Sequence, residues 1–169
     1  MRVFAVAMTT ALLSAAALAP AAHAAGRSRS PVLEPALTGS CTIKKTEIAA
    51  SDSFDESTSL DFVNLGDAGS ITFKSKKAGC VGGTFFANAG SAGSGDSIVL
   101  QVLLDNSACE PLVDTYFFAN SGSDFSSHSA AFFCGANIPA GTHKIQVQYA
   151  SYLGDEAEFY QRTLEVTHN

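Results

Sequence analysis

Hydrophobic and polar residues alternate along short segments of this chain. The clearest alternation runs from Thr142 to Tyr149, where every second residue is His, Ile, Val or Tyr and the residues between them are Thr, Lys or Gln. This period of two predicts a β-strand with one buried face and one solvated face. The segment Ser97–Leu104 is almost continuously apolar, which predicts a central strand that is covered on both faces.

Similar segments recur up to the C-terminus and are separated by clusters of Gly, Ser, Asn and Asp, a pattern typical of strands joined by turns. The predicted strands are Thr42–Ile48, Ser59–Leu65, Ser70–Lys76, Val81–Ala87, Ser97–Leu104, Val113–Ala119, His128–Cys134, Thr142–Ala150 and Glu158–Val166. No long segment has the period of a helix. About nine short strands predict an all-β fold, an antiparallel β-sandwich of jelly-roll type.

Three pairs of adjacent phenylalanines fall within these strands. They are Phe85 with Phe86, Phe117 with Phe118, and Phe132 with Phe133. Neighbouring residues of a strand point to opposite faces, so each pair places one ring on each face. We therefore expect both faces of these strands to be covered, by internal packing or by a partner.

Arg162 lies in the last predicted strand and alternates there with Tyr160, Leu164 and Val166. It is therefore expected on the face that those residues bury. A buried arginine needs a carboxylate or carbonyl partner, and we predict a structural ion pair in preference to a substrate clamp.

The first 24 residues have the parts of a secretory signal peptide. A positive start at Arg2 precedes the apolar run Val3–Leu18, and Ala22-His23-Ala24 fits the small-x-small cleavage pattern. The apolar run is shorter than the roughly 20 residues of a membrane span, so we expect cleavage and no membrane anchor. Residues 25–40, rich in Ser, Arg and Pro, are predicted to be a flexible leader, and residues 41–169 to form one domain.

The net negative charge of the chain limits the classes of partner that it can bind. The full sequence has ten Lys and Arg against sixteen Asp and Glu, and cleavage removes one basic residue, which leaves a formal charge of −7. An acidic chain repels polyanions, so nucleic acid is excluded as a partner. An extracellular or cell-surface protein of this kind is expected to bind another protein or a glycan.

The four cysteines, Cys41, Cys80, Cys109 and Cys134, all follow the predicted cleavage site. An even number in an exported chain predicts two disulfides. No CxxC or HxxxH spacing is present, so neither a metal site nor a cofactor is predicted. Strands of alternating direction would bring Cys80, Cys109 and Cys134 to one end of the sandwich, which favours Cys109–Cys134 and leaves Cys41 for Cys80. The other pairings stay open.

Turn-and-strand motifs mark the C-terminal half. Ile138–His143, the alternating strand after it and Arg162–Val166 form a terminal hairpin pattern, and Phe62–Leu65, Gly69–Phe73 and Val99–Asp105 extend it upstream. This pattern resembles a group of secreted bacterial jelly-roll-like domains of unassigned activity. Similar patterns occur in C1q-like and phage-fibre sandwiches, so the resemblance implies a fold and hardly narrows the function.

Three histidines remain after the predicted cleavage: His128, His143 and His168. A serine hydrolase would need one of them beside a nucleophile and an orienting acid, but the chain has no G-x-S-x-G elbow. Ser94 and Ser97 lie in a Gly- and Ser-rich segment that predicts a flexible hairpin loop. We expect His143 to bond backbone at the edge of the core and His168 to fray, and we predict no catalytic residue.

Carboxylates cluster in two segments of the chain. The first cluster has Asp52, Asp55, Glu56 and Asp61, and the second has Asp155, Glu156 and Glu158. Neither fits the D-x-D-x-D-G loop of a calcium site. Solvated turn acids are the favoured interpretation; an irregular calcium site and a glycosidase pair stay open because both depend on distances.

Carbohydrate-binding sandwiches present aromatic rings to the apolar face of a sugar. This chain has no Trp and four tyrosines, Tyr116, Tyr149, Tyr152 and Tyr160. Tyr152 lies in the predicted loop Ser151–Glu156 and is the predicted ligand contact, because loop residues are not needed for the core. We expect the other three to pack in the core or at its rim.

Together these patterns predict a secreted, non-enzymatic β-sandwich that acts as an extracellular binding or interaction module. Two more specific interpretations stay open. One is a carbohydrate-binding module, and the other is a C1q-like or fibre-like oligomeric structural protein.

Overall fold

The computed structural model describes residues 45–93, 96–110, 117–120 and 122–169. The predicted signal peptide, the predicted leader and Cys41 lie outside these ranges. The described residues contain no apolar helix long enough to cross a membrane.

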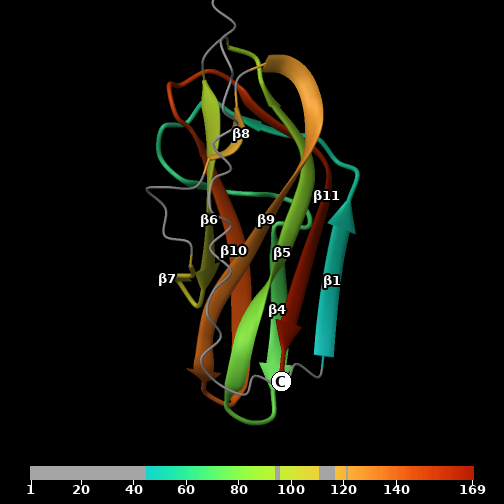
Figure 1. The fold of residues 1–169 in the computed structure, drawn as a ribbon, viewed down its shortest axis with the longest axis vertical. Helices are drawn as coiled ribbons and strands as arrows, with labels where there is room; N and C mark the ends of the chain where they lie inside the picture. Colours follow the sequence, from blue (N-terminus) through green and yellow to red (C-terminus); the bar gives the residue numbers. More distant parts are fainter. Residues whose placement is uncertain (1–44, 94–95, 111–116, 121) are drawn as a thin grey trace, which may run out of the picture. The chain divides into compact units, whose positions relative to one another are not determined.

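The described residues form eleven strands in two antiparallel sheets (Figure 1). The first sheet has the order β1 (Lys45–Ser51), β11 (Ala157–His168), β5 (Gly79–Ser91) and β9 (Gly122–Ile138), and β2 (Asp55–Ser57) also pairs with β11. In the second sheet β3 (Val63–Asn64) and β4 (Ser70–Ser75) pair with β10 (Gly141–Ser151), β10 pairs with β6 (Ser97–Leu104), and β6 pairs with β7 (Ser107–Ala108) and β8 (Phe117–Asn120).

The connectivity of the two sheets is that of a jelly roll. The order β1-β11-β5-β9 in one sheet faces β4-β10-β6-β8 in the other, so consecutive long strands repeatedly cross between the sheets, as the two Greek keys of that fold require. The all-β, antiparallel prediction is confirmed.

The core lies between the inner faces of both sheets. The alternation of β10 is as predicted, with Ile145, Val147 and Tyr149 fully buried and the residues between them exposed or half-buried. The prediction for β6 is partly wrong. This strand lies inside its sheet, between β10 and β8, but only every second residue is buried. Val99 and Leu103 sit half-exposed on its outer face, because that face is not covered by a further layer of the described chain.

Strand boundaries differ most where side chains bond the local backbone. The predicted strand Ser59–Leu65 is wrong over most of its length. The Ser59 hydroxyl donates to the Asp61 carbonyl at 2.7 Å and accepts from the Asp61 N–H at 3.1 Å, and such a turn competes with ladder pairing. Conversely, β5, β9 and β11 all extend beyond their predicted ends.

The Cys109–Cys134 disulfide is present, with a Cα–Cα distance of 4.2 Å. It joins the segment after β7 to β9, where Glu110 and Phe133 also exchange backbone hydrogen bonds of 2.8 and 2.9 Å. The pairing favoured from the sequence is therefore confirmed for these two cysteines. The predicted Cys41–Cys80 bridge stays a prediction, since Cys41 lies outside the described residues.

The expectation that His168 frays is wrong. Its side chain is fully buried, and its ring lies 4.4 Å from that of Phe73 between centroids. The reason is that β11 continues to His168, which pairs with Lys45 of β1 on one side and Val81 of β5 on the other. A strand paired on both sides holds its last residue in the sheet.

Candidate functional site

A β-bulge in β11 decides which residues reach the outer face of the first sheet. Tyr160 lies opposite Asn88 of β5, but Thr163 lies opposite Phe86, so β11 contains one extra residue. Gln161 takes it up with a φ of 48°, the left-handed backbone conformation found in many bulges. The alternation of β11 shifts by one position there, so Arg162 turns inward while Tyr160 stays outward.

Four aromatic side chains lie exposed on this outer face, and we call them the aromatic face: Phe54, Phe86, Phe125 and Tyr160. Their exposed fractions are 50%, 44%, 46% and 41% respectively. Their inward neighbours are buried, as for Phe85 and Phe159, both 0% exposed. The rings of Phe54 and Phe125 meet edge to face at 6.4 Å between centroids.

The exposure of Phe86 and Tyr160 shows that two predictions from the sequence were wrong. The ring of Phe86 is not covered to the degree that the Phe85–Phe86 pair predicted. Tyr160 was expected to pack with the residues around Arg162, and the bulge instead exposes it. The prediction does hold for Phe132, which is buried, and Phe133, which is half-buried.

A row of hydrogen-bonded polar side chains crosses the same face between the rings. Ser127 of β9 donates to the Asn88 Oδ1 at 2.6 Å, and Asn88 Nδ2 donates to the Gln161 Oε1 at 2.6 Å. We call these three residues the amide row. Because the row uses both ends of the Asn88 amide, it leaves the Gln161 amide nitrogen and the Ser127 oxygen lone pairs available to a ligand.

Three carboxylates border the aromatic face at the end where β2 meets β11. Glu56 lies opposite Glu158 in the β2–β11 ladder, and side-chain oxygens of Glu56, Glu156 and Glu158 all lie within 4.8 Å of one another. Repulsion by Glu156, then slight burial, a hydrogen bond with Glu156 and the charge of Glu158 raise the pKa of Glu56. The fold thus joins members of the two acidic clusters, while Asp52, Asp61 and Asp155 stay exposed and apart from this group.

Beneath the bulge, Arg162 anchors a buried polar network. Its Nη1 lies 3.2 Å from the Asp55 Oδ2, and its Nη2 donates to the Ser53 hydroxyl at 2.6 Å. The Tyr149 hydroxyl donates to the Asp55 Oδ1 at 3.1 Å, and burial followed by the charge of Asp55 raises the pKa of Tyr149. The predicted structural ion pair of Arg162 is confirmed, and Tyr149 belongs to the core as expected.

The predicted ligand contact, Tyr152, is 58% exposed in the turn between β10 and β11, with Leu153 beside it at 61%. Asp96 fixes this turn from below: it is fully buried and accepts from the Ser151 hydroxyl at 2.6 Å and from the backbone N–H groups of Leu153 at 2.8 Å and Asp155 at 3.0 Å. Exposure of Tyr152 agrees with the prediction, whereas its role as a ligand contact stays a prediction.

The histidines are placed differently from a catalytic set. His143 bonds the Pro139 carbonyl at 2.9 Å, as expected, and also the Asp105 carboxylate at 2.7 Å. His128 Nε2 lies 2.7 Å from the Ser126 hydroxyl, a contact that sequence reasoning missed, and burial lowers the pKa of His128. No carboxylate among the described residues bonds His128, so this pair lacks the orienting acid of a triad. Ser94 lies outside the described residues.

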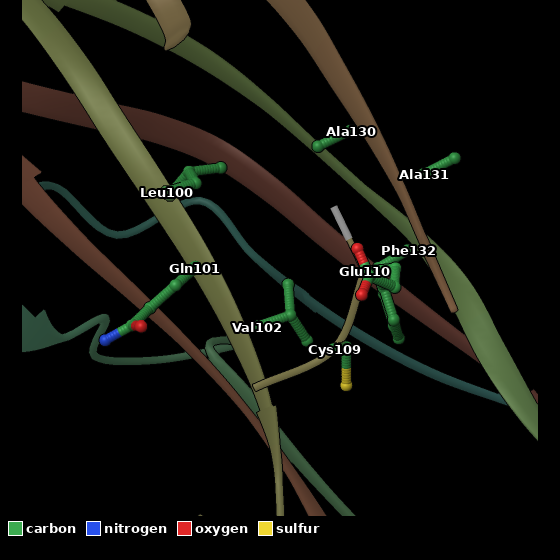
Figure 2. Close-up of a pocket in the computed structure, with 8 residues that line it drawn as sticks. All are labelled: Leu100, Gln101, Val102, Cys109, Glu110, Ala130, Ala131 and Phe132. Atoms are coloured by element: carbon green, nitrogen blue, oxygen red, sulfur yellow. The ribbon is translucent and has the colours of Figure 1, made fainter. Parts of the chain in front are cut away.

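A small pocket opens between β6 and β9 (Figure 2), lined by Leu100, Gln101, Val102, Cys109, Glu110, Ala130, Ala131 and Phe132. Its cavity volume is about 20 Å³, room for roughly one water molecule and far below a ligand pocket. The outer face of the first sheet, and not this pocket, is therefore the candidate site.

Comparison with known proteins adds likeness of fold only. The sequence matches no family model and no curated protein. Infectious bursal disease virus VP2 aligns with 80% of this chain and 36% of its own, at 13% identity and a TM-score of 0.49. The alignment with latent PorU from Porphyromonas gingivalis covers 74% of this chain and 12% of PorU, at 10% identity and a TM-score of 0.46. The alignment with the CBM36-1 domain of a multidomain xylanase from the hindgut metagenome of Trinervitermes trinervoides covers 71% of this chain and 96% of that domain. The identity is 11% and the TM-score is 0.37.

The chain thus spans about a third or less of VP2 and PorU, at 36% and 12% of their lengths. With TM-scores below 0.5, these likenesses say nothing about function. The jelly-roll assignment rests on the strand order itself.

Proposed function

We propose that this chain is a non-enzymatic extracellular binding module whose ligand is a glycan that lies across the aromatic face. The observation that carries the proposal is the combination of four exposed aromatic rings with a hydrogen-bonded amide row on one sheet face. Sugars have apolar faces that stack on aromatic rings and hydroxyl rims that bond amides and hydroxyls. An open sheet face suits a chain bound along its length, whereas a pocket would suit a chain end.

The spacing within the face supports this proposal. Phe86 and Asn88 are two residues apart on β5, and Tyr160 lies opposite Asn88. In a regular antiparallel pair, diagonal neighbours such as Phe86 and Tyr160 are about 7 to 8 Å apart, and here this diagonal crosses the β-bulge. A ring, an amide and a second ring therefore follow one another at distances comparable to the size of one or two sugar units.

Affinity gel electrophoresis on a panel of soluble polysaccharides tests the proposal. We expect retention of the purified protein by at least one polymer, and Phe86→Ala and Tyr160→Ala each to weaken it about tenfold, equivalent to about 1.4 kcal/mol. Both rings are exposed, so thermal unfolding should show that these variants stay folded.

Tyr152→Ala is the matched control, because it removes another exposed tyrosine, 58% exposed against 41% for Tyr160, from the turn between β10 and β11. Unchanged retention of this variant, with loss in Tyr160→Ala, supports the aromatic face. The reverse pattern would assign binding to the β10–β11 turn instead, and no retention on any polymer would reject the glycan.

Self-assembly into a structural oligomer is the second candidate. The observation in its favour is Ile48 of β1, which is 66% exposed on the same outer face and extends the apolar surface toward the sheet edge. Sedimentation velocity separates the two functions: a monomer across a hundredfold range of concentration excludes assembly, and an oligomer that Phe86→Ala dissociates would favour it.

A further inference from the structure

The two outer faces of the sandwich carry opposite charge. On the first sheet, the outward ionisable residues near the aromatic face are Glu56, Glu158 and Glu165, with Glu156 beside the first two. On the second sheet, Lys74 of β4 and Lys144 of β10 point outward and are exposed. Among the described residues, the carboxylates named here therefore lie on the side of the aromatic face, and these two lysines lie on the opposite sheet.

No basic residue in the described part of the chain lies on the aromatic face. Arg162 is buried beneath it, and Lys76 and Lys77 lie in the turn between β4 and β5. Lys45 pairs with His168 at one end of β11, whereas Glu158 is ten residues away near the other end. At about 3.3 Å per residue this separation is roughly 30 Å, well beyond the Debye length of about 8 Å at physiological salt.

We infer that the aromatic face selects uncharged glycans and rejects anionic ones. The inference rests on the proposed glycan-binding function and adds the class of ligand to it. Rings and amides bind neutral and acidic sugars with similar chemistry, so they discriminate little between the two. Uncompensated carboxylates beside the rings supply the discrimination, because each acidic group of a bound polymer would lie near like charges with no basic residue to receive it.

The size of the effect follows from Coulomb's law. A polymer carboxylate about 6 Å from each of Glu56, Glu156 and Glu158 is repelled in a medium of water-like dielectric, and salt screens that repulsion. The expected penalty is about tenfold in affinity at 20 mM salt and about twofold at 500 mM salt. Discrimination that shrinks with salt is thus the signature of this mechanism.

The experiment uses polymers that share a backbone and differ in charge. Hydroxyethyl cellulose is compared with carboxymethyl cellulose, and arabinoxylan with glucuronoxylan, by affinity electrophoresis at both salt concentrations. For the wild-type protein we expect the neutral member of a pair to bind about tenfold more tightly at 20 mM salt. In the double variant Glu56→Gln, Glu158→Gln the ratio between the two members should approach two.

Lys74→Gln with Lys144→Gln is the control, because it changes as many charges on the opposite face and should leave the ratio as in the wild type. Equal binding of both members by the wild-type protein, or a ratio that does not change in the glutamine variant, would overturn the inference while leaving the glycan function intact. Failure of every polymer to bind would instead overturn the proposed function and the inference with it.

Discussion

His143 lies against two hydrogen-bond acceptors that favour its protonated form. Its Nδ1 lies 2.7 Å from the Asp105 carboxylate, and its Nε2 lies 2.9 Å from the Pro139 carbonyl oxygen. Both partners accept hydrogen bonds, so the ring can donate to both of them only as an imidazolium. His143 is only 8% exposed. Its hydrogen bonds connect the turn after β6, which contains Asp105, to the turn before β10, which contains Pro139.

The pH dependence follows from the sign of this shift. The hydrogen bond to Asp105 raises the pKa of His143 above its usual value, burial works against the shift, and the bond to Pro139 adds to it. A raised folded pKa means that the stabilisation is fully present below the unfolded pKa of about 6.5 and is lost as the pH rises through the folded pKa. The contribution of His143 to the free energy of unfolding therefore falls from acid to alkaline pH.

The magnitude is set by two hydrogen bonds to a charged group, each about 1.5 to 3 kcal/mol when buried. The Asp105 side chain is 49% exposed, so solvent weakens its part considerably. We expect His143→Gln to lower the free energy of unfolding by about 2 kcal/mol at pH 5.5 and by about 1 kcal/mol at pH 8.5. The loss at pH 5.5 corresponds to roughly 6 to 8 °C in Tm for a domain of this size.

Urea unfolding of wild type and variant at both pH values measures these differences, and subtraction cancels the titration of all other groups. Asp105→Asn is the control: Asn tolerates the φ of 49° at this position, keeps an acceptor and removes the charge, so most of the pH dependence should disappear. An equal loss in His143→Gln at pH 5.5 and 8.5, or an NMR titration of His143 with a midpoint at or below 6.5, would refute the argument.

Two further predictions concern buried acids and their partners. Asp96→Asn should lower the free energy of unfolding by about 3 kcal/mol near neutral pH. Burial raises the pKa of Asp96, but the hydrogen bonds from Ser151 and from backbone N–H groups outweigh burial and lower it. The loss should therefore shrink as the pH falls below about 3.8, which urea titrations at several pH values would show. Arg162→Met should cost about 3 kcal/mol in the same assay, because it leaves the Asp55 carboxylate without its cation; a loss under about 1 kcal/mol would mean that solvent satisfies Asp55.

Features that depend on local pattern were predictable from the sequence. The alternation of β10 and the burial of Arg162 follow from a period of two, and Cys109–Cys134 follows from strands that alternate in direction. Features that depend on the partner layer were not. The outer face of β6 carries Val99 and Leu103 without a cover from the described chain, and His168 is ordered because β1 and β5 both pair with it.

The bulge at Gln161 is the largest difference between the predicted and the observed strand β11. A left-handed residue is usually Gly, Asn or Asp, and Gln has no such preference, so the sequence carries no mark of the bulge. Without it, Tyr160 and Arg162 would share a face, as predicted. The extra residue places Arg162 on the inner face and Tyr160 on the outer face, and both placements bear on the candidate site.

Turned inward, Arg162 holds Ser53 and Asp55 below the sheet at 2.6 and 3.2 Å. Residues 53 to 56 alternate, so fixing those two inward directs Phe54 and Glu56 outward, onto the aromatic face and its acidic border. Turned outward, Tyr160 and Gln161 complete the rings and the amide row. The ion pair is thus expected to position the face above it, and a variant that breaks it should weaken the proposed glycan binding as well as folding, even though Arg162 itself is buried.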